Sequence, residues 1–128
     1  MLEAQKEAGR FCWGELLTSD VAGAKQFYTE LFGWQMEDIV CGGMDYTTIK
    51  VNGDDIGGIM KTPAEAGDEV PPMWGNYVAV DDVDVSAAKA EQMGGAVCVP
   101  AQDIPDTGRF CVIKDPQGAM LSLFSHSK

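Results

Sequence analysis

The chain has 128 residues, a length that suits one domain or two small modules sharing a core. Its composition, 45% apolar and 23% charged, is that of a folded globular protein and argues against global disorder. The formal net charge of −11, with no cluster of Lys or Arg, argues against non-specific nucleic-acid binding, because phosphates would be repelled. An acidic surface also suits a cationic ligand, although solubility is the simpler explanation for it.

The first ten residues, MLEAQKEAGR, lack the apolar segment of a signal peptide, and no stretch approaches a membrane span. We therefore expect a cytoplasmic protein with no membrane partner. The four cysteines show no CxxC spacing, which predicts reduced and mostly buried thiols. Cysteine catalysis would need a base, and the one histidine, His126, lies close to the C-terminus, where we expect fraying.

The first half of the chain predicts one strand, one helix and three further strands. The strand covers 10–17 (RFCWGELL), and Thr18-Ser19-Asp20 is typical of a helix start, because short oxygen-bearing side chains accept from free N–H groups. Gly33 ends the helix. Its apolar residues recur at helical spacing and predict one apolar face of the helix: Val21, Ala24, Phe27, Tyr28, Leu31 and Phe32. Strands follow at 34–38, 45–51 and 55–60, with an Asn52-Gly53-Asp54-Asp55 hairpin turn before the last.

The second half repeats this order after a Pro- and Gly-containing connector at 61–73. A strand at 74–80 leads to a helix that starts at Asp81-Asp82 and ends at Gly94-Gly95. The apolar stripe of this helix consists of Val83, Ala87, Ala90 and Met93. Strands follow at 96–99, 109–114 and 119–124, and the turn Asp115-Pro116-Gln117-Gly118 joins the last two.

Each half is thus predicted as a βαβββ module, and residues of the two halves match at a shift of 61. The identities fall at the strand, the helix start and the helix end: Trp13 with Trp74, Gly14 with Gly75, Asp20 with Asp81, Glu30 with Glu91 and Gly33 with Gly94. We interpret this as an internal duplication within a single domain of residues 1–128. Module one covers 10–60, the linker 61–73 and module two 74–125. The predicted fold class is α+β, with two modules whose curved sheets enclose a cavity.

Three stretches carry a resemblance to a known family: WGELLTSDVAGAKQFYTELFGW, VAVDDVDVSAAKAEQMGG and KDPQGAMLSLF. The chain resembles the glyoxalase/bleomycin-resistance/extradiol-dioxygenase group, the vicinal oxygen chelate superfamily, over nearly all of 10–125. The resemblance is specific for the fold and much less so for the reaction. It implies a homodimer.

Enzymes of this superfamily hold a divalent metal with His, Glu or Gln on the first and last strands of each module, and the metal binds two adjacent substrate oxygens. Carried over onto this chain, the ligand positions fall on Trp13, Gly75, Ser122 and Gly57 or a close neighbour of it. These residues supply no plausible ligand set, and Glu15 alone is a single carboxylate. We therefore expect no metal cofactor and no catalytic residue of the usual kind.

A cavity without those ligands would be wide, aromatic and acidic. Trp13 could stack on a planar or cationic ligand, and Glu15 could pair with a positive group. The candidate ligand-binding residues are Trp13, Glu15, Tyr46, Met60, Trp74, Tyr77 and Ser122. The alternative for the aromatics and methionines is a place in the core, and for Glu15 an exposed edge. Gly57-Gly58 indicates close backbone approach or a sheet bend rather than a phosphate loop.

Three functions remain open at this point. The first, which we favour, is a non-enzymatic binder of a small cationic or aromatic molecule, like the drug-sequestering proteins of the superfamily. The second is a metal-dependent lyase, isomerase or dioxygenase of the glyoxalase type with a non-standard site. The third is an interaction module whose cavity is filled by Trp13 and Trp74.

Overall fold

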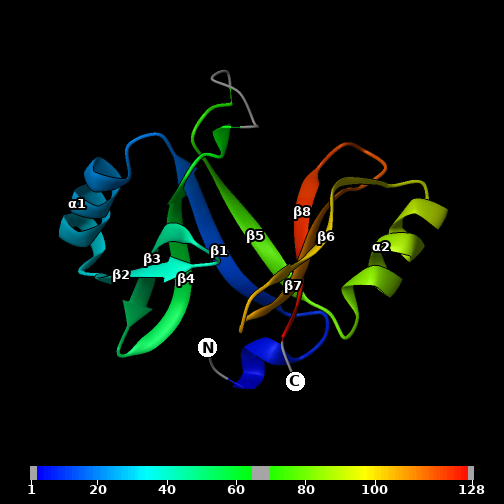
Figure 1. Cartoon of the computed structure of the whole chain (residues 1–128), viewed down its shortest axis with the longest axis horizontal. Coiled ribbons are helices and arrows are strands. Elements are labelled where there is room, and N and C mark those ends of the chain that lie inside the picture. The colour runs from blue at the N-terminus through cyan, green and yellow to red at the C-terminus, as the bar shows by residue number, and fades with distance from the viewer. Residues whose placement is uncertain (1–2, 65–69, 127–128) are drawn as a thin grey trace. The chain divides into compact units, whose positions relative to one another are not determined.

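The computed structural model describes residues 3–64 and 70–126, which form two compact units. Unit 1 consists of 14–64 and 70–75, and unit 2 of 3–13 and 76–126, so the strands β1 and β5 contribute residues to both. Figure 1 shows the elements, which are in chain order η1 (Glu3–Lys6), β1 (Phe11–Thr18), α1 (Val21–Phe32), β2 (Gln35–Cys41), β3 (Met44–Val51), β4 (Asp54–Lys61), β5 (Met73–Ala79), α2 (Val83–Gln92), β6 (Ala96–Ile104), β7 (Gly108–Lys114) and β8 (Met120–His126).

In unit 1, α1 packs on a sheet in which the strands run β2-β3-β4-β1 (Figure 1). β1 pairs with β4 in parallel, and the β2–β3 and β3–β4 pairs are antiparallel. The core lies between the helix and the sheet, where Leu16, Ile49 and Ile59 are at most 5% exposed. The turn between β3 and β4 has positive φ at Asn52 (51°) and Gly53 (83°), as an Asn-Gly hairpin turn requires.

The apolar residues of α1 cover a larger part of the helix surface than the part that packs on the core. Val21, Ala24 and Tyr28 pack against the core, as predicted. Phe27, Leu31 and Phe32, from the same apolar pattern, each remain 57–58% exposed. The apolar pattern is thus only partly covered by the sheet, and no α1 residue is fully buried.

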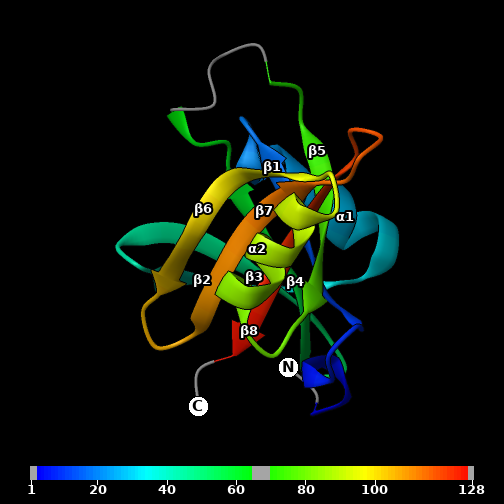
Figure 2. The ribbon, with the colours of Figure 1, turned by 90° about the vertical axis from the view of Figure 1, so that its right-hand side faces the viewer.

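In unit 2, the strands run β5-β8-β7-β6, with β5 parallel to β8 and the other pairs antiparallel. Figure 2 shows α2 lying across this sheet, and the helix contacts β6, β7 and β8. Val83 and Ala87 of α2 are buried against Cys111 and Leu123. Because side chains alternate along a strand, Phe124 points to the other face of the sheet, where it packs in a second cluster with Cys12 and Ala79.

Both helices start at an aspartate cap. The two caps are 62 residues apart, one residue more than the shift of 61 at which identical residues match. Asp20 accepts from the Gly23 N–H at the start of α1, and Asp82, not Asp81, accepts from the first turn of α2. Counted back seven residues from each cap, Trp13 corresponds to Gly75 rather than to Trp74. The interpretation of the two tryptophans as equivalent was therefore wrong, and a one-residue shift moves a strand side chain to the other face.

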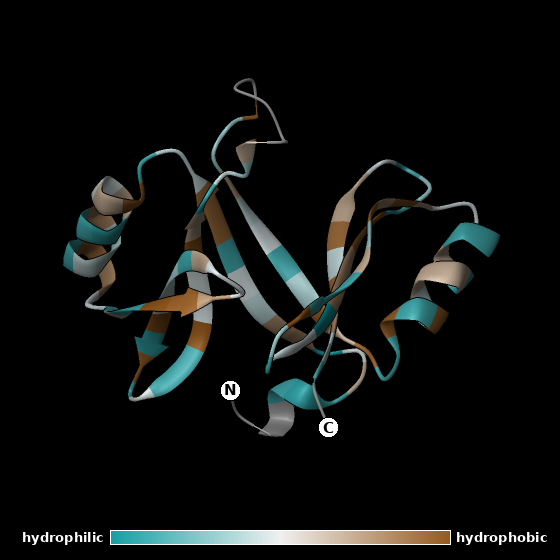
Figure 3. Cartoon of the chain, in the orientation of Figure 1, coloured by the Kyte–Doolittle hydropathy of each residue, from teal (hydrophilic) through white to brown (hydrophobic). Residues whose placement is uncertain are grey.

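The order βαβββ occurs in each half, which confirms the predicted fold class of mixed α and β structure. Hydrophobic and hydrophilic residues succeed one another in bands along the strands, as period-two alternation predicts (Figure 3).

β6 runs to Ile104, five residues beyond the predicted end at Val99, with register irregularities around Val99. The middle of the predicted connector, 65–69, lies outside the described residues. None of the described helices is long and apolar enough to cross a membrane.

Candidate functional site

A carboxylate and a phenol meet on the face of the unit 1 sheet that turns away from α1. Leu16 on β1 is 5% exposed and packs in the core beneath α1, so its neighbour Glu15 lies on the opposite face. Tyr46 on β3 reaches across to β1, where its hydroxyl donates to Glu15 Oε2 over 2.8 Å. The hydrogen bond fixes the direction of the carboxylate on this face.

Gly58 on β4 makes this contact possible. It lies opposite Glu15 on β1 and Thr48 on β3, beneath the Tyr46 side chain. A methyl group at Gly58 would overlap the Tyr46 hydroxyl and ring carbons. The preceding Gly57 lies against the Gly14 carbonyl, where a Cβ would also clash. The prediction that the two glycines mark close approach is confirmed, by backbone at Gly57 and by an aromatic ring at Gly58.

Met60 belongs to the same face as Gly58, two residues farther along β4, and pairs with Leu17 on β1. The structure therefore places three of the seven predicted site residues together in unit 1, namely Glu15, Tyr46 and Met60.

Three other predicted site residues lie together in unit 2. Trp13 and Tyr77 are partly buried and pack against the cluster of Cys12, Ala79 and Phe124. Ser122 on β8 lies beside Tyr77 in the parallel β5–β8 pair. Tyr77 and Ser122 thus lie side by side on the face of this sheet that turns away from α2, and Trp13 packs against the same cluster as Tyr77.

Trp74 lies apart from both groups. Its indole Nε1 donates to the Tyr28 hydroxyl over 3.2 Å, and its ring meets those of Tyr28 and Trp34 edge to face, with centroids 5.3 and 6.1 Å apart. Tyr28 packs on the core beneath α1, so Trp74 belongs to the helix side of unit 1. Trp74 therefore does not share the face of unit 1 on which Glu15 lies.

The positions that the superfamily uses for metal ligands do not fit a divalent ion here. Trp13 supplies an indole without a lone pair for a metal, Gly57 and Gly75 supply no side chain, and Ser122 supplies one hydroxyl. Across residues 3–64 and 70–126, no three His, Cys, Asp or Glu side chains gather as a metal site would need.

The cysteines and the histidine do not form a nucleophile–base pair in the described chain. Cys12 and Cys111 are buried, and burial raises the pKa of each thiol, which keeps both protonated at neutral pH. His126 is the last residue of β8, and its ring meets that of Phe124 edge to face at 4.6 Å.

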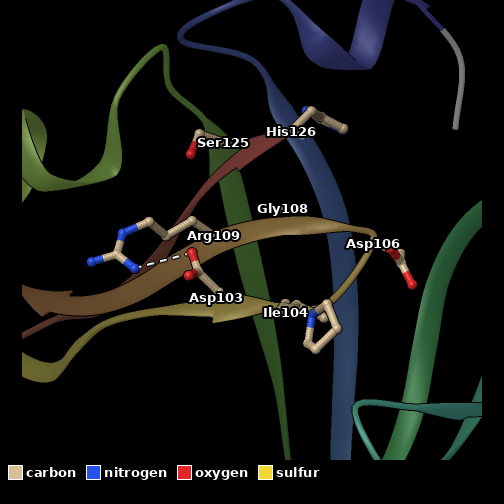
Figure 4. Close-up of a pocket in the computed structure, with 8 residues that line it drawn as sticks. Asp103, Ile104, Asp106, Gly108, Arg109, Ser125 and His126 are labelled. Atoms are coloured by element: carbon tan, nitrogen blue, oxygen red, sulfur yellow. Dashed lines mark hydrogen bonds and ion pairs between the residues drawn. The ribbon is translucent and has the colours of Figure 1, made fainter. Parts of the chain in front are cut away.

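An open hollow of about 400 Å³, which the sequence did not predict, lies in unit 2 at the β6–β7 turn and the end of β8. Figure 4 shows its lining: Asp103, Ile104, Pro105, Asp106, Gly108, Arg109, Ser125 and His126. Arg109 is bound by Asp103 at 3.0 Å and by both oxygens of Asp84, at 2.9 and 3.1 Å. These carboxylates raise the pKa of Arg109 and neutralise its charge, so the hollow has no strong attraction for an anion.

Comparison with known proteins identifies the family. The family model for the glyoxalase/bleomycin resistance protein/dioxygenase superfamily matches residues 10–123. A putative glyoxylase, CFP32, of Mycobacterium tuberculosis is 42% identical over 118 residues, which are 91% of this chain and 45% of that protein. An anthracycline biosynthesis protein, DnrV, of Streptomyces peucetius is 32% identical over 130 residues, 91% of this chain and 46% of that protein. The chain thus spans less than half the length of these relatives.

Solved structures share the fold at low sequence identity. Methylmalonyl-CoA epimerase from Mycobacterium tuberculosis aligns with a TM-score of 0.68 at 17% identity, over 100% of this chain and 94% of the epimerase chain. Homoprotocatechuate 2,3-dioxygenase from B. fuscum aligns with a TM-score of 0.64 at 17% identity, over 96% of this chain and 34% of the dioxygenase chain. By its sequence, and in agreement with this fold, the chain belongs to the glyoxalase/bleomycin resistance protein/dioxygenase superfamily.

Proposed function

We propose that the protein binds a small aromatic cation without chemical conversion, and that the family's metal site is degenerate in this chain. The observation that carries the proposal is the Glu15 carboxylate, held by the Tyr46 hydroxyl at 2.8 Å over Gly58. A carboxylate accepts hydrogen bonds only, so the group it recognises is a donor, and a cationic N–H donor gives the strongest such bond.

The chemistry of the neighbouring residues supports a ligand with an apolar, planar part. Met60 shares the face of Glu15 and Tyr46, and a thioether adapts its shape to an aromatic surface. Trp13 and Tyr77 add aromatic surface in unit 2, with Ser122 as a polar neighbour. The net charge of −11 attracts a cation at long range and repels an anionic substrate.

The alternative function is a metal-dependent lyase, isomerase or dioxygenase. The residues at the positions of the family's metal ligands argue against it. That alternative needs at least three good donors around an ion, and Trp13, Gly57, Gly75 and Ser122 supply one hydroxyl. We further propose that the protein acts as a homodimer.

The test is ligand-dependent melting with a defined probe. An anthracycline that carries an amino sugar is planar, aromatic and cationic, and the name of the Streptomyces relative makes this class a reasonable first choice. Its uncharged aglycone is the matched probe without the cation. We expect the glycoside to raise the melting temperature of the wild type, and we expect Glu15→Gln to weaken its binding about ten- to hundredfold, the loss of one charge-assisted hydrogen bond.

The control variant is Glu30→Gln, which removes the same charge from an exposed position on α1. It should bind both probes as the wild type does, and binding of the aglycone should not distinguish Glu15→Gln from the wild type. A glycoside that binds Glu15→Gln and wild type equally, or that binds neither, would contradict the proposed role of Glu15.

A further inference from the structure

A second hollow, of about 280 Å³, lies in unit 2 on the side of the sheet that α2 covers. One side of α2, the end of β7 and the start of the turn after β7 form its walls. We call it the α2 hollow, and six of its lining residues define it: Lys89, Ala90, Met93, Ile113, Lys114 and Pro116.

The spacing of residues along α2 and one glycine shape the α2 hollow. Lys89 and Met93 are four residues apart, so they lie one turn from each other on the same side of the helix, next to Ala90. Gly95 lets the end of the helix approach β7 closely, because a Cβ there would lie 2.6 Å from the Lys114 carbonyl oxygen and 3.1 Å from that of Ala90. The lining is therefore set by the backbone of two elements that pack tightly.

Much of the lining is apolar and accessible. Ala90 and Ile113 are half-buried, and Ile113 packs on the core cluster beneath α2. Met93 is 68% exposed, although it belongs to the apolar stripe of the helix, and Pro116 is exposed in the turn. A ligand with a short hydrocarbon chain would cover these carbon atoms and remove them from water, which favours binding.

The lysines at the α2 hollow differ from most basic residues of this acidic chain. The chain has 20 acidic and 9 basic residues. Four basic side chains each bind at least one carboxylate: Arg10, Lys25, Lys50 and Arg109. Within residues 3–64 and 70–126, by contrast, Lys61, Lys89 and Lys114 make no ion pair. Two of these three lysines line the α2 hollow.

One carboxylate, that of Asp115, also lines the α2 hollow. Its Oδ1 accepts from the backbone N–H groups of Gln117 at 3.0 Å and Ala119 at 2.9 Å, so this side chain holds its own turn. Two lysines and one aspartate give the lining a net charge of +1, in a chain whose net charge is −11. Because salt screens charges beyond about 8–10 Å, the lining and not the whole chain decides which ion is held here.

We propose that the α2 hollow binds a small carboxylate that carries a short aliphatic chain. Lys89 and Lys114 supply the ammonium donors for the carboxylate, and the aliphatic chain covers Ala90, Met93 and Ile113. A volume of about 280 Å³ lies just below the range of about 300–1,000 Å³ that holds drug-sized ligands, which suits a smaller molecule. The site is separate from that of the proposed function, because the α2 hollow lies within unit 2 and Glu15 belongs to unit 1.

Titration of the isotope-labelled full chain, followed by the NMR signals of its backbone amides, tests the proposal with three probes. Hexanoate has the charge and the chain, acetate lacks the chain, and 1-hexanol lacks the charge. We expect hexanoate to cause saturable shifts at Met93, Gly95 and Ile113. Acetate and 1-hexanol should each bind about threefold or more weakly, and added salt should weaken the binding of hexanoate but not of 1-hexanol.

Four variants separate the contribution of charge from that of apolar contact. Lys89→Gln and Lys114→Gln should each weaken hexanoate binding about two- to fivefold, the value of an exposed ion pair, and leave 1-hexanol binding unchanged. Met93→Ser should weaken both probes, because it removes apolar surface. Lys61→Gln is the matched control, since it removes the same charge from an exposed lysine outside the α2 hollow, and it should bind both probes as the wild type does.

All four substituted positions are exposed, so the variants should fold, and the amide spectrum of each checks this. Hexanoate that causes no saturable shift at the α2 hollow would overturn the proposal. So would 1-hexanol that binds the wild type as tightly as hexanoate does. A chain with both Lys89→Gln and Lys114→Gln that binds hexanoate as tightly as the wild type would overturn it as well.

Discussion

The helices α1 and α2 occupy the same place in the order βαβββ, yet they use their apolar residues differently. α2 has few large apolar residues and buries Val83 and Ala87, which are 1% and 9% exposed. α1 is richer in large apolar residues and buries none completely, leaving Phe27, Leu31 and Phe32 more than half exposed. The two helices thus differ in how much of their apolar surface their own sheets cover.

The polar contacts that hold the two helices also differ. Lys25 of α1 binds one carboxylate, that of Asp38 on β2, at 2.8 Å. Asp84 of α2 binds both Nε and Nη2 of Arg109 on β7, and Arg109 also binds Asp103 on β6. The bidentate arrangement fixes the orientation of α2 more strictly than a single ammonium fixes that of α1.

The largest expected effect is on the free energy of unfolding, when the first residue of each helix is replaced by alanine. Val83 is 1% exposed, whereas Val21 is half-buried. Val83→Ala should lower the free energy of unfolding by about 2 kcal/mol, since it removes two buried carbon groups and leaves a cavity, and Val21→Ala by about half as much.

Urea unfolding of the wild type and both variants, at one protein concentration, measures this difference. Equal losses of unfolding free energy at the two positions would show that the start of α1 is packed as tightly as the start of α2. That result would contradict the difference drawn here between the two helices.

A smaller effect concerns pH. Arg109 lowers the pKa of Asp84, and Lys25 together with Thr47 lowers the pKa of Asp38. A carboxyl group whose pKa is lower in the folded state stabilises the fold above its unfolded pKa, near 3.8, and loses that contribution as the pH falls through the folded value. Arg109→Gln and Lys25→Gln should therefore both be less stable than the wild type at neutral pH, with Arg109→Gln losing more.

Acid titration of each variant checks the sign. The difference in stability between variant and wild type should shrink as the pH falls below about 4. A difference that stays constant from neutral to acid pH would show that these residues act through packing and not through charge.

Much of the fold was predictable because local signals agree with the tertiary structure. The caps at Asp20 and Gly33 and the Asn52-Gly53 turn each act within a few residues, and the structure has them where the sequence predicts them. The end of β6 was not predictable, because Pro100 signals a break while the irregular pairing with β7 lets the strand continue to Ile104.

The candidate site was predictable only in part. The nearness of Glu15 to Tyr46 depends on the pairing of β1 with β4 and of β4 with β3, which the sequence does not encode locally. The surroundings of Trp74 were not predictable locally, because its ring contacts Tyr28, 46 residues away in the sequence. The exposure of Leu31 could not be predicted either, since helical spacing shows which residues share a face but not whether that face is covered.

The central claim is that this member of the superfamily binds its ligand without the family's metal. The most direct test is the metal content per chain, measured on untagged protein purified without chelator and again after incubation with Ni, Zn, Mn and Fe salts. We predict that no metal remains near one equivalent after gel filtration, because Trp13, Gly57, Gly75 and Ser122 cannot hold one. A near-stoichiometric metal that survives gel filtration would contradict the account and direct attention to ligands around Glu15.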